Sequence, residues 1–148
     1  MMKIIFNQIN QQGLLDAVMP AHVIYPEVDD LPAGFSSIWI QDYLRNKMQF
    51  NGVVFSDDLS MQGAAQIGNI AQRAKAAMFA GCDMVLVCND PKGAAQVIDS
   101  LPSDGFKEHP LNQRISRLAK GPSANFTTLC KSPEYAKAQR CLEAFYAA

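Results

Sequence analysis

The sequence predicts an α/β fold in which parallel strands are covered by helices. Three apolar runs without polar alternation occur at residues 17–24, 53–56 and 84–88, and each is followed by a helical pattern. Unbroken runs rich in Val, Met and Leu are typical of strands that are buried on both faces, as in a parallel sheet. The chain of 148 residues is 49% hydrophobic and 18% charged, which is enough apolar material for one globular domain with a core.

The first strand is followed by a helix with a clear apolar side. Pro20 lies inside the first apolar run, and proline is tolerated only at a sheet edge, at a bulge or at a strand end. The helix is expected to begin at Ser36 or Ser37, because serine is a good N-cap residue. Its apolar residues recur at three- and four-residue spacings, namely Trp39, Ile40, Tyr43, Leu44 and Met48.

Two further pairs of strand and helix follow along the chain. The strand at residues 53–56 precedes a helix expected over residues 63–80, with Gly81 as its C′ residue. The third strand precedes a helix that opens with Asp90 as N-cap and Pro91 as its first residue. Strands and helices therefore alternate three times.

A small signature is repeated before each strand, as L-D-A-V-M, F-N-G-V-V and C-D-M-V-L. It places Asp16, Asn51 and Asp83 at separations of 35 and 32 residues. Near-equal spacing of strand plus helix is expected of a repeated (β/α) unit. A doubly wound open sheet and part of a TIM barrel both satisfy this alternation.

The last third of the chain is predicted to form helices that pack and carry no chemistry. Residues 114–121 form a short helix that ends at a glycine, and a longer helix begins with Ser132 as N-cap and Pro133 at its first position. The apolar side of the longer helix consists of Tyr135, Ala138, Leu142 and Phe145.

Charge and cysteine content exclude several classes of function. A net charge of -1 and a pI near 6.1 give no reason to expect nucleic acid or a membrane as partner. Four cysteines without a C-x-x-C pair, and only two histidines, argue against a zinc site and a disulfide scaffold. The N-terminal apolar run breaks at Asn7, too early for a signal peptide or a membrane span. We therefore expect reduced thiols and a cytoplasmic protein.

Two adjacent carboxylates, Asp57 and Asp58, end the second apolar run. Ligands of parallel α/β folds gather at the C-terminal ends of strands, so both are candidates for chemistry. Successive side chains of a strand point to opposite faces, and only one of the two can face a pocket. An aspartate here can also simply cap the next helix. Asp58 is nearer that helix, which leaves Asp57 as the candidate for chemistry.

Three segments carry a long and specific pattern: D-A-V-M-P-A-H-V-I-Y-P (16–26), F-N-G-V-V-F-S-D-D-L-S-M-Q-G-A (50–64) and A-G-C-D-M-V-L-V-C-N (80–89). The pattern resembles the family 3 glycoside hydrolases, specifically the bacterial β-N-acetylhexosaminidases of peptidoglycan recycling. The resemblance runs from about residue 3 to residue 100 and, more loosely, into the tail.

The resemblance implies a TIM-like (β/α)8 barrel and a retaining mechanism in which Asp57 attacks the anomeric carbon. The implied substrate is a terminal β-linked N-acetylglucosamine, mainly GlcNAc-1,6-anhydroMurNAc with or without its peptide, and no metal or organic cofactor is implied. A retaining glycosidase also needs a group that protonates the leaving oxygen. In this family that acid/base is a histidine on a loop after a K-H-F-P-G-x-G segment, which the sequence does not contain.

Asp58 and His22 are the two substitutes that the sequence offers for this acid/base, and both are disfavoured. Asp58 faces away from Asp57 on the same strand, whereas the two groups of a retaining enzyme flank the scissile bond. His22 lies on a different strand from the acid/base of the family. We interpret His22 as a histidine that lines the pocket and contributes to substrate binding.

By resemblance, residues 1–102 correspond to the last three units of the barrel and residues 103–148 to a helical tail that packs on it. The chain alone is then expected to expose apolar strand edges and to be poorly stable. We expect little or no turnover unless a partner supplies the missing N-terminal half of the barrel. A non-catalytic remnant and a small doubly wound ligand-binding domain are the alternatives, and the lack of a G-x-G-x-x-G or P-loop segment disfavours the second.

Overall fold

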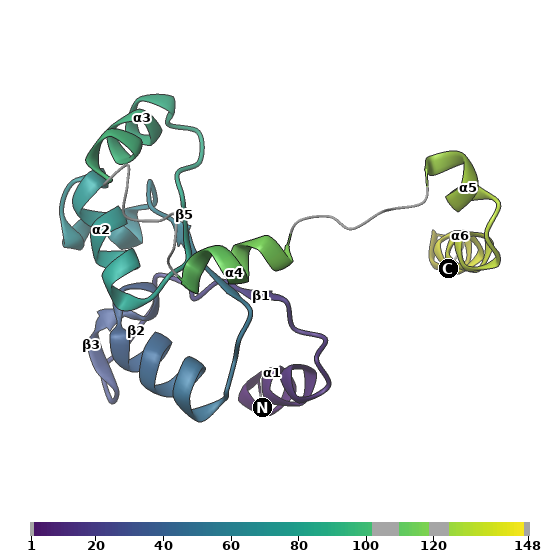
Figure 1. Ribbon diagram of the computed structural model, residues 1–148, viewed down its shortest axis with the longest axis horizontal. Coiled ribbons are helices and arrows are strands. Elements are labelled where there is room, and N and C mark those ends of the chain that lie inside the picture. Colours follow the sequence, from purple (N-terminus) through teal and green to yellow (C-terminus); the bar gives the residue numbers. More distant parts are fainter. Residues whose placement is uncertain (1, 102–109, 119–124, 147–148) are drawn as a thin grey trace. The chain divides into compact units, whose positions relative to one another are not determined.

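The protein is described here by a computed structural model of residues 2–101, 110–118 and 125–146 (Figure 1). The chain divides into two compact units, Met1–Leu118 and Ala119–Ala148. The boundary that we expected at residue 102 lies outside the described residues. Within the described ranges, no helix combines the length and the apolar composition needed to cross a bilayer.

Three parallel strands form the sheet of the first unit. β4 (Val53–Asp58) lies in the centre, between β1 (Ala17–Val18) and β5 (Met84–Leu86). The paired residues are Ala17 with Val53, Val18 with Val54, Phe55 with Met84 and Asp58 with Leu86. A doubly wound sheet reverses its strand order at a switch point, whereas a barrel adds its strands in one direction. The uninterrupted chain order therefore confirms the α/β class and favours part of a barrel.

Helices connect these strands and cover the sheet. In chain order they are α1 (Met2–Gln11), the 3₁₀-helix η1 (Ala33–Phe35), the π-helix η2 (Ile38–Lys47), the 3₁₀-helix η3 (Gln62–Ile67), α2 (Ile70–Ala80), α3 (Pro91–Ser100) and α4 (Pro110–Arg117). Figure 1 shows α2 and α3 side by side.

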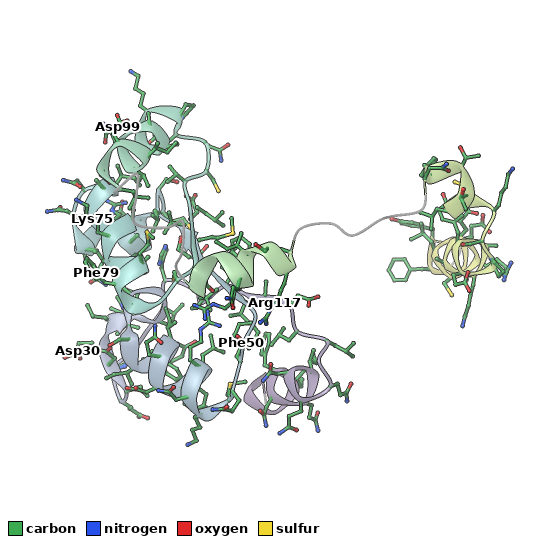
Figure 2. The ribbon with its side chains drawn as sticks, in the orientation of Figure 1. Asp30, Phe50, Lys75, Phe79, Asp99 and Arg117 are labelled. Atoms are coloured by element: carbon green, nitrogen blue, oxygen red, sulfur yellow. The ribbon has the colours of Figure 1, made fainter. Side chains whose placement is uncertain are left out.

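The core lies where β4, η2 and α2 meet. Val54 of β4, Ile40 of η2 and Ala74 of α2 are fully buried. Alanine on the buried side of α2 lets this helix approach the sheet closely. On its opposite side Phe79 is 87% exposed and projects from the outer surface of the unit (Figure 2).

The prediction of a strand over residues 17–24 is wrong in its length. β1 ends at Val18, two residues before Pro20, because proline has no N–H group for a ladder hydrogen bond. The chain then forms a separate antiparallel hairpin of β2 (Ile24–Tyr25) and β3 (Asp29–Pro32).

The prediction of a single helix over residues 63–80 is also wrong, because two separate helices occupy this range. η3 is followed by Gly68, whose φ of 127° is not helical. α2 begins anew after Asn69, which accepts a hydrogen bond from the Gln72 N–H while the Gln72 side chain accepts one from the Asn69 N–H. This capping box fixes the new start. The expected end is confirmed, since Gly81 has the left-handed φ of 116°.

Two other helix starts agree with the prediction. Ser36 Oγ accepts the Trp39 N–H at 3.2 Å at the beginning of η2, although the π-helical winding of η2 was not foreseen. Asp90 Oδ1 accepts the Gly93 N–H at 2.9 Å, with proline at the first position of α3. The helix expected over residues 114–121 is α4, which begins four residues earlier, and its expected glycine end lies outside the described residues.

Asp83, one residue of the repeated signature, holds together the N-terminal ends of the strands. Its side chain is fully buried and accepts the Val54 N–H at 2.7 Å. It also pairs with the guanidinium groups of Arg45 at 2.6 Å and Arg114 at 2.8 Å. These contacts lie at the strand end opposite to Asp57, where the residues of barrel folds serve stability.

An apolar groove of about 500 Å³ runs beside β1. Its walls come from α1, β1 and η2, and include Phe6, Val18, Met19, Trp39 and Tyr43. Among the described residues β1 pairs only with β4, so its other edge is open. The groove agrees with the expectation that this chain exposes an apolar strand edge.

The described part of the second unit consists of α5 (Phe126–Cys130) and α6 (Pro133–Tyr146). Ser132 Oγ accepts the Tyr135 N–H at 3.1 Å, which confirms Ser132 as the cap of α6. Phe145 is 76% exposed within this arrangement. That this tail packs on a barrel stays a prediction.

Candidate active site

Asp57 lies near the C-terminal end of the central strand, where parallel α/β folds bind their ligands. Its Oδ1 accepts the Asp58 N–H at 2.9 Å, and its Oδ2 accepts the His22 N–H at 3.4 Å. A carboxylate offers about four lone-pair sites. Two backbone donors therefore orient this half-buried carboxylate and leave part of its acceptor capacity for a reacting atom.

Asp58 is held from the opposite side, by residues near β5. Its Oδ1 accepts the Cys88 N–H at 3.0 Å and the Ser60 N–H at 2.9 Å, and its Oδ2 accepts the Ser60 hydroxyl at 2.7 Å. Burial acts to raise the pKa of Asp58, but the hydrogen bonds from Cys88 and Ser60 outweigh burial and hold this pKa below its ordinary value. The Asp58 carboxylate therefore holds the turn that follows β4.

Asp58 does not cap the helix that follows, so the prediction of a helix-capping role for this residue is wrong. The residue before η3 is Met61, which has no side-chain cap, and α2 is capped by Asn69. Asp58 instead links the end of β4 to the chain after β5, which is a contact between strands rather than within a helix.

His22 reaches the same strand end from the segment between β1 and β2. Its Nε2 lies 3.1 Å from the carbonyl oxygen of Asp58, and its ring stacks on Phe35 with centroids 4.9 Å apart. It also lines an open cavity of about 550 Å³, together with residues of η3 such as Gln62 and Gln66. The structure thus brings together His22 and Asp57, 35 residues apart in the sequence.

Neither substitute for the acid/base is arranged to protonate a leaving group. Nδ1 of His22 is buried and Nε2 faces a backbone carbonyl, while three donors engage the Asp58 carboxylate. Among the side chains that the structure describes, no three His, Cys, Asp or Glu residues gather so that they could hold a metal ion. The chemistry available at this site is that of one oriented carboxylate.

Two residues that shape the site were not identified from the sequence. Phe35 supports the His22 ring, and Gly63 is so close that a Cβ there would come within 3.1 Å of the His22 Cβ. The available signal for Gly63 was a glycine shortly after a strand end, where close approach of another segment is common. Phe35 offered no comparable signal.

Known proteins resemble the chain in sequence and in fold. The profile described as "Glycosyl hydrolase family 3 N terminal domain" matches residues 3–120. A Beta-hexosaminidase of Idiomarina loihiensis is 52% identical over 130 residues, which cover 86% of this chain and 38% of that protein. Native NagZ from Neisseria gonorrhoeae has a TM-score of 0.76 at 36% identity, covering 91% of this chain and 37% of that chain. NagZ from the same organism in complex with N-trifluoroacetyl-D-glucosamine also gives 0.76 at 36% identity, covering 91% and 38%.

The chain therefore spans about 38% of the length of the Idiomarina loihiensis relative. The structural likeness confirms the expected fold class, a portion of the TIM-like barrel. Since the profile covers most of the chain and includes β1, β4 and β5, the whole sheet lies within the match. This chain belongs to glycosyl hydrolase family 3.

Proposed function

We propose that this chain carries the nucleophile of a retaining β-N-acetylhexosaminidase, and that the nucleophile is Asp57. The observation that carries the proposal is the carboxylate at the end of β4, oriented by two backbone N–H groups while the neighbouring Asp58 is engaged elsewhere. The Beta-hexosaminidase relatives and the NagZ structure with N-trifluoroacetyl-D-glucosamine support an amino-sugar substrate.

The proposed reaction has two steps. Asp57 attacks the anomeric carbon of a terminal β-linked N-acetylglucosamine, and the bond to the leaving oxygen breaks as an acid donates a proton to that oxygen. Water then hydrolyses the glycosyl ester, which restores the carboxylate and retains the β configuration. We propose GlcNAc-1,6-anhydroMurNAc, with or without its peptide, as the natural substrate and His22 as part of the pocket wall. All four cysteines are free, which suits the cytoplasm as the site of the reaction.

The acid/base and most sugar contacts would come from barrel units that are not in this sequence. A complete eight-unit barrel needs at least about 200 residues, and this chain has 148. The groove beside β1 supports such a partner, because it joins an open strand edge to an apolar surface. Acid/base assistance is typically worth 10²- to 10⁴-fold in rate, so the chain alone should turn over little substrate.

The test is hydrolysis of an aryl β-N-acetylglucosaminide by the chain mixed with an N-terminal fragment of a family 3 relative. We expect the mixture to restore activity and the Asp57→Asn variant to abolish it. Asp99→Asn is the matched control, since it removes one negative charge from an exposed position on α3 and should leave the activity unchanged. A fluorosugar that slows the second step should leave a covalent adduct on the peptide that contains Asp57, detected by mass spectrometry.

Two results would contradict the proposal. Activity that survives Asp57→Asn would exclude Asp57 as the nucleophile. A soluble, folded pair of fragments without activity would leave the non-catalytic remnant as the better interpretation.

A further inference from the structure

His22 contacts two consecutive residues at the end of β4. Its backbone N–H donates to the Asp57 carboxylate, and its ring Nε2 lies 3.1 Å from the Asp58 carbonyl oxygen. We propose that His22 is a positioning residue, which holds the Asp57 carboxylate and the following peptide in the geometry for attack, and that its ring is not a ligand of the substrate. The functional part of this inference rests on the proposed function of Asp57.

The His22 ring is fixed from several directions. It lies parallel to the ring of Phe35, with an interplanar angle of 2°, and Phe35 is itself only 4% exposed. Gly63 is close to the base of the side chain, since a Cβ there would come within 3.1 Å of the His22 Cβ. The ring edge faces Gly34, where a Cβ would lie 3.7 Å from Nδ1. These contacts leave the side chain little freedom to turn toward a ligand.

The contact with Asp58 determines which ring nitrogen carries the proton. A carbonyl oxygen only accepts hydrogen bonds, so Nε2 must be the protonated nitrogen. Nδ1 then presents a lone pair, and this atom is buried without a partner among the described residues. The geometry thus assigns the Nε2–H tautomer to His22.

The strand end that carries the nucleophile is therefore contacted from two sides. His22 approaches it from the β1 side, and Cys88 holds Asp58 from the β5 side. A displacement of about 1 Å at a reacting group can cost on the order of 10²-fold in rate. Loss of the ring contact should therefore slow the attack step and change substrate affinity little.

The tautomer can be measured in the chain as it exists, without any activity. In ¹⁵N-labelled protein, long-range correlations of the imidazole nitrogens report which nitrogen is protonated, and the chain has only two histidines to assign. We expect a single Nε2–H form for His22. An Nδ1–H form, or the averaged signals of a freely exchanging imidazole, would overturn the inference.

Two variants separate positioning from packing. The side-chain amide nitrogen of glutamine can occupy the place of Nε2, so His22→Gln can keep the contact with the Asp58 carbonyl oxygen. The amide nitrogen of asparagine corresponds to Nδ1, so His22→Asn loses this contact. The Asp58 carbonyl shares its peptide group with the Leu59 N–H, which donates to the Leu86 carbonyl oxygen at 2.9 Å. We expect His22→Asn to speed hydrogen exchange of this Leu59 amide by about tenfold relative to His22→Gln. In the reconstituted enzyme, His22→Asn should lower kcat by about 10²-fold with KM nearly unchanged, and His22→Gln should recover most of this loss.

These measurements test the positioning role of His22 separately from the proposed role of Asp57 as the nucleophile. Equal exchange rates of the Leu59 amide in the two variants would show that the contact between the His22 ring and the Asp58 carbonyl does not fix the strand end. A raised KM with unchanged kcat would make His22 a substrate ligand and also overturn it. If the mixture has no activity at all, the tautomer and exchange measurements still decide whether His22 fixes the strand end.

Discussion

Asp58 accepts a hydrogen bond from the backbone N–H of Cys88 at 3.0 Å, across 30 residues of sequence. This contact joins the C-terminal end of β4 to the segment that follows β5. The pairing of the two strands has a register irregularity at the same place, between Phe55 and Asp58. Asp57, one residue earlier, takes no part in it and contacts His22 instead. Adjacent carboxylates thus have separate tasks, one in the framework and one at the reactive position.

Stability should depend on the ionised form of Asp58. Its pKa is held below the ordinary value of 3.8 by hydrogen bonds that outweigh burial. A lowered folded-state pKa contributes stability that is complete above the unfolded-state value and is lost as pH falls through the folded value. We expect Asp58→Asn to be less stable than the native chain at neutral pH, and the difference to shrink below about pH 4. Urea denaturation at several pH values measures it.

The matched control for this experiment is Asp30→Asn, because Asp30 is an exposed carboxylate on the surface of the same unit (Figure 2). It removes one negative charge without touching a turn between strands. A difference for Asp58→Asn that stays constant down to pH 2 would contradict the role assigned to the Asp58 carboxylate.

The four cysteines should separate into two classes of reactivity. Burial, reinforced by the adjacent Asp83 carboxylate, raises the pKa of the Cys82 thiol to about 12, while Cys88, Cys130 and Cys141 are exposed. The thiolate is the reactive form, so Cys82 should stay unmodified by a disulfide reagent at pH 8. We expect three thiols to react in the folded chain and the fourth only after guanidinium is added. Four rapid reactions without denaturant would contradict the described core.

Asp83 should be among the most costly residues to replace. Removing one partner of a buried ion pair typically destabilises a protein by about 3–5 kcal/mol, because the remaining charges lose their compensation. Asp83→Ala would leave Arg45 and Arg114 without their shared carboxylate and the Val54 N–H without an acceptor. We expect a loss of this size in the free energy of unfolding, or no cooperative transition at all.

Asp99→Ala is the comparison for this prediction, since Asp99 is exposed on α3 (Figure 2). Changes at such positions are usually within about 0.5 kcal/mol. Equal effects of the two substitutions would show that the buried cluster does not hold the sheet together.

Self-association of the chain should depend on the groove beside β1. Met19 is 50% exposed at this groove, next to the open edge of the strand. Lysine at a strand edge is a common natural protection against unwanted pairing. We expect Met19→Lys to reduce association in sedimentation velocity. Ile98→Lys, at a position that is 71% exposed on α3, should have much less effect, and an equal effect would argue for non-specific apolar contact.

Much of the fold follows from local patterns in the sequence. The central strand, the glycine end of α2 and the caps of α3 and α6 depend on residues within a few positions of one another. The break at Gly68 was predictable in principle, because N-I-A-Q is a capping-box pattern. It was missed because the apolar spacing runs through it. The β2–β3 hairpin was missed because its residues are mostly exposed and do not alternate.

The candidate site was predictable only in part. The position of Asp57 follows from a strand end, which is a local feature. The contacts that orient it come from His22, on a segment 35 residues away, and that separation is closed only by the pairing of β1 with β4. No periodicity in the sequence specifies which loop atom meets which carboxylate. The stacking of Phe35 on His22 therefore could not be predicted, and for Gly63 the glycine after a strand end was the one available signal.

The salt bridge between Arg114 and Asp83 also bears on how this protein should be shortened for expression. A chain that ends at residue 102 would lose Arg114 and leave the carboxylate with a single guanidinium partner. One that ends after Leu118 keeps the contact and coincides with the end of the first compact unit. The shortest fragment worth purifying is therefore defined by an arginine on α4 rather than by the last strand of the sheet.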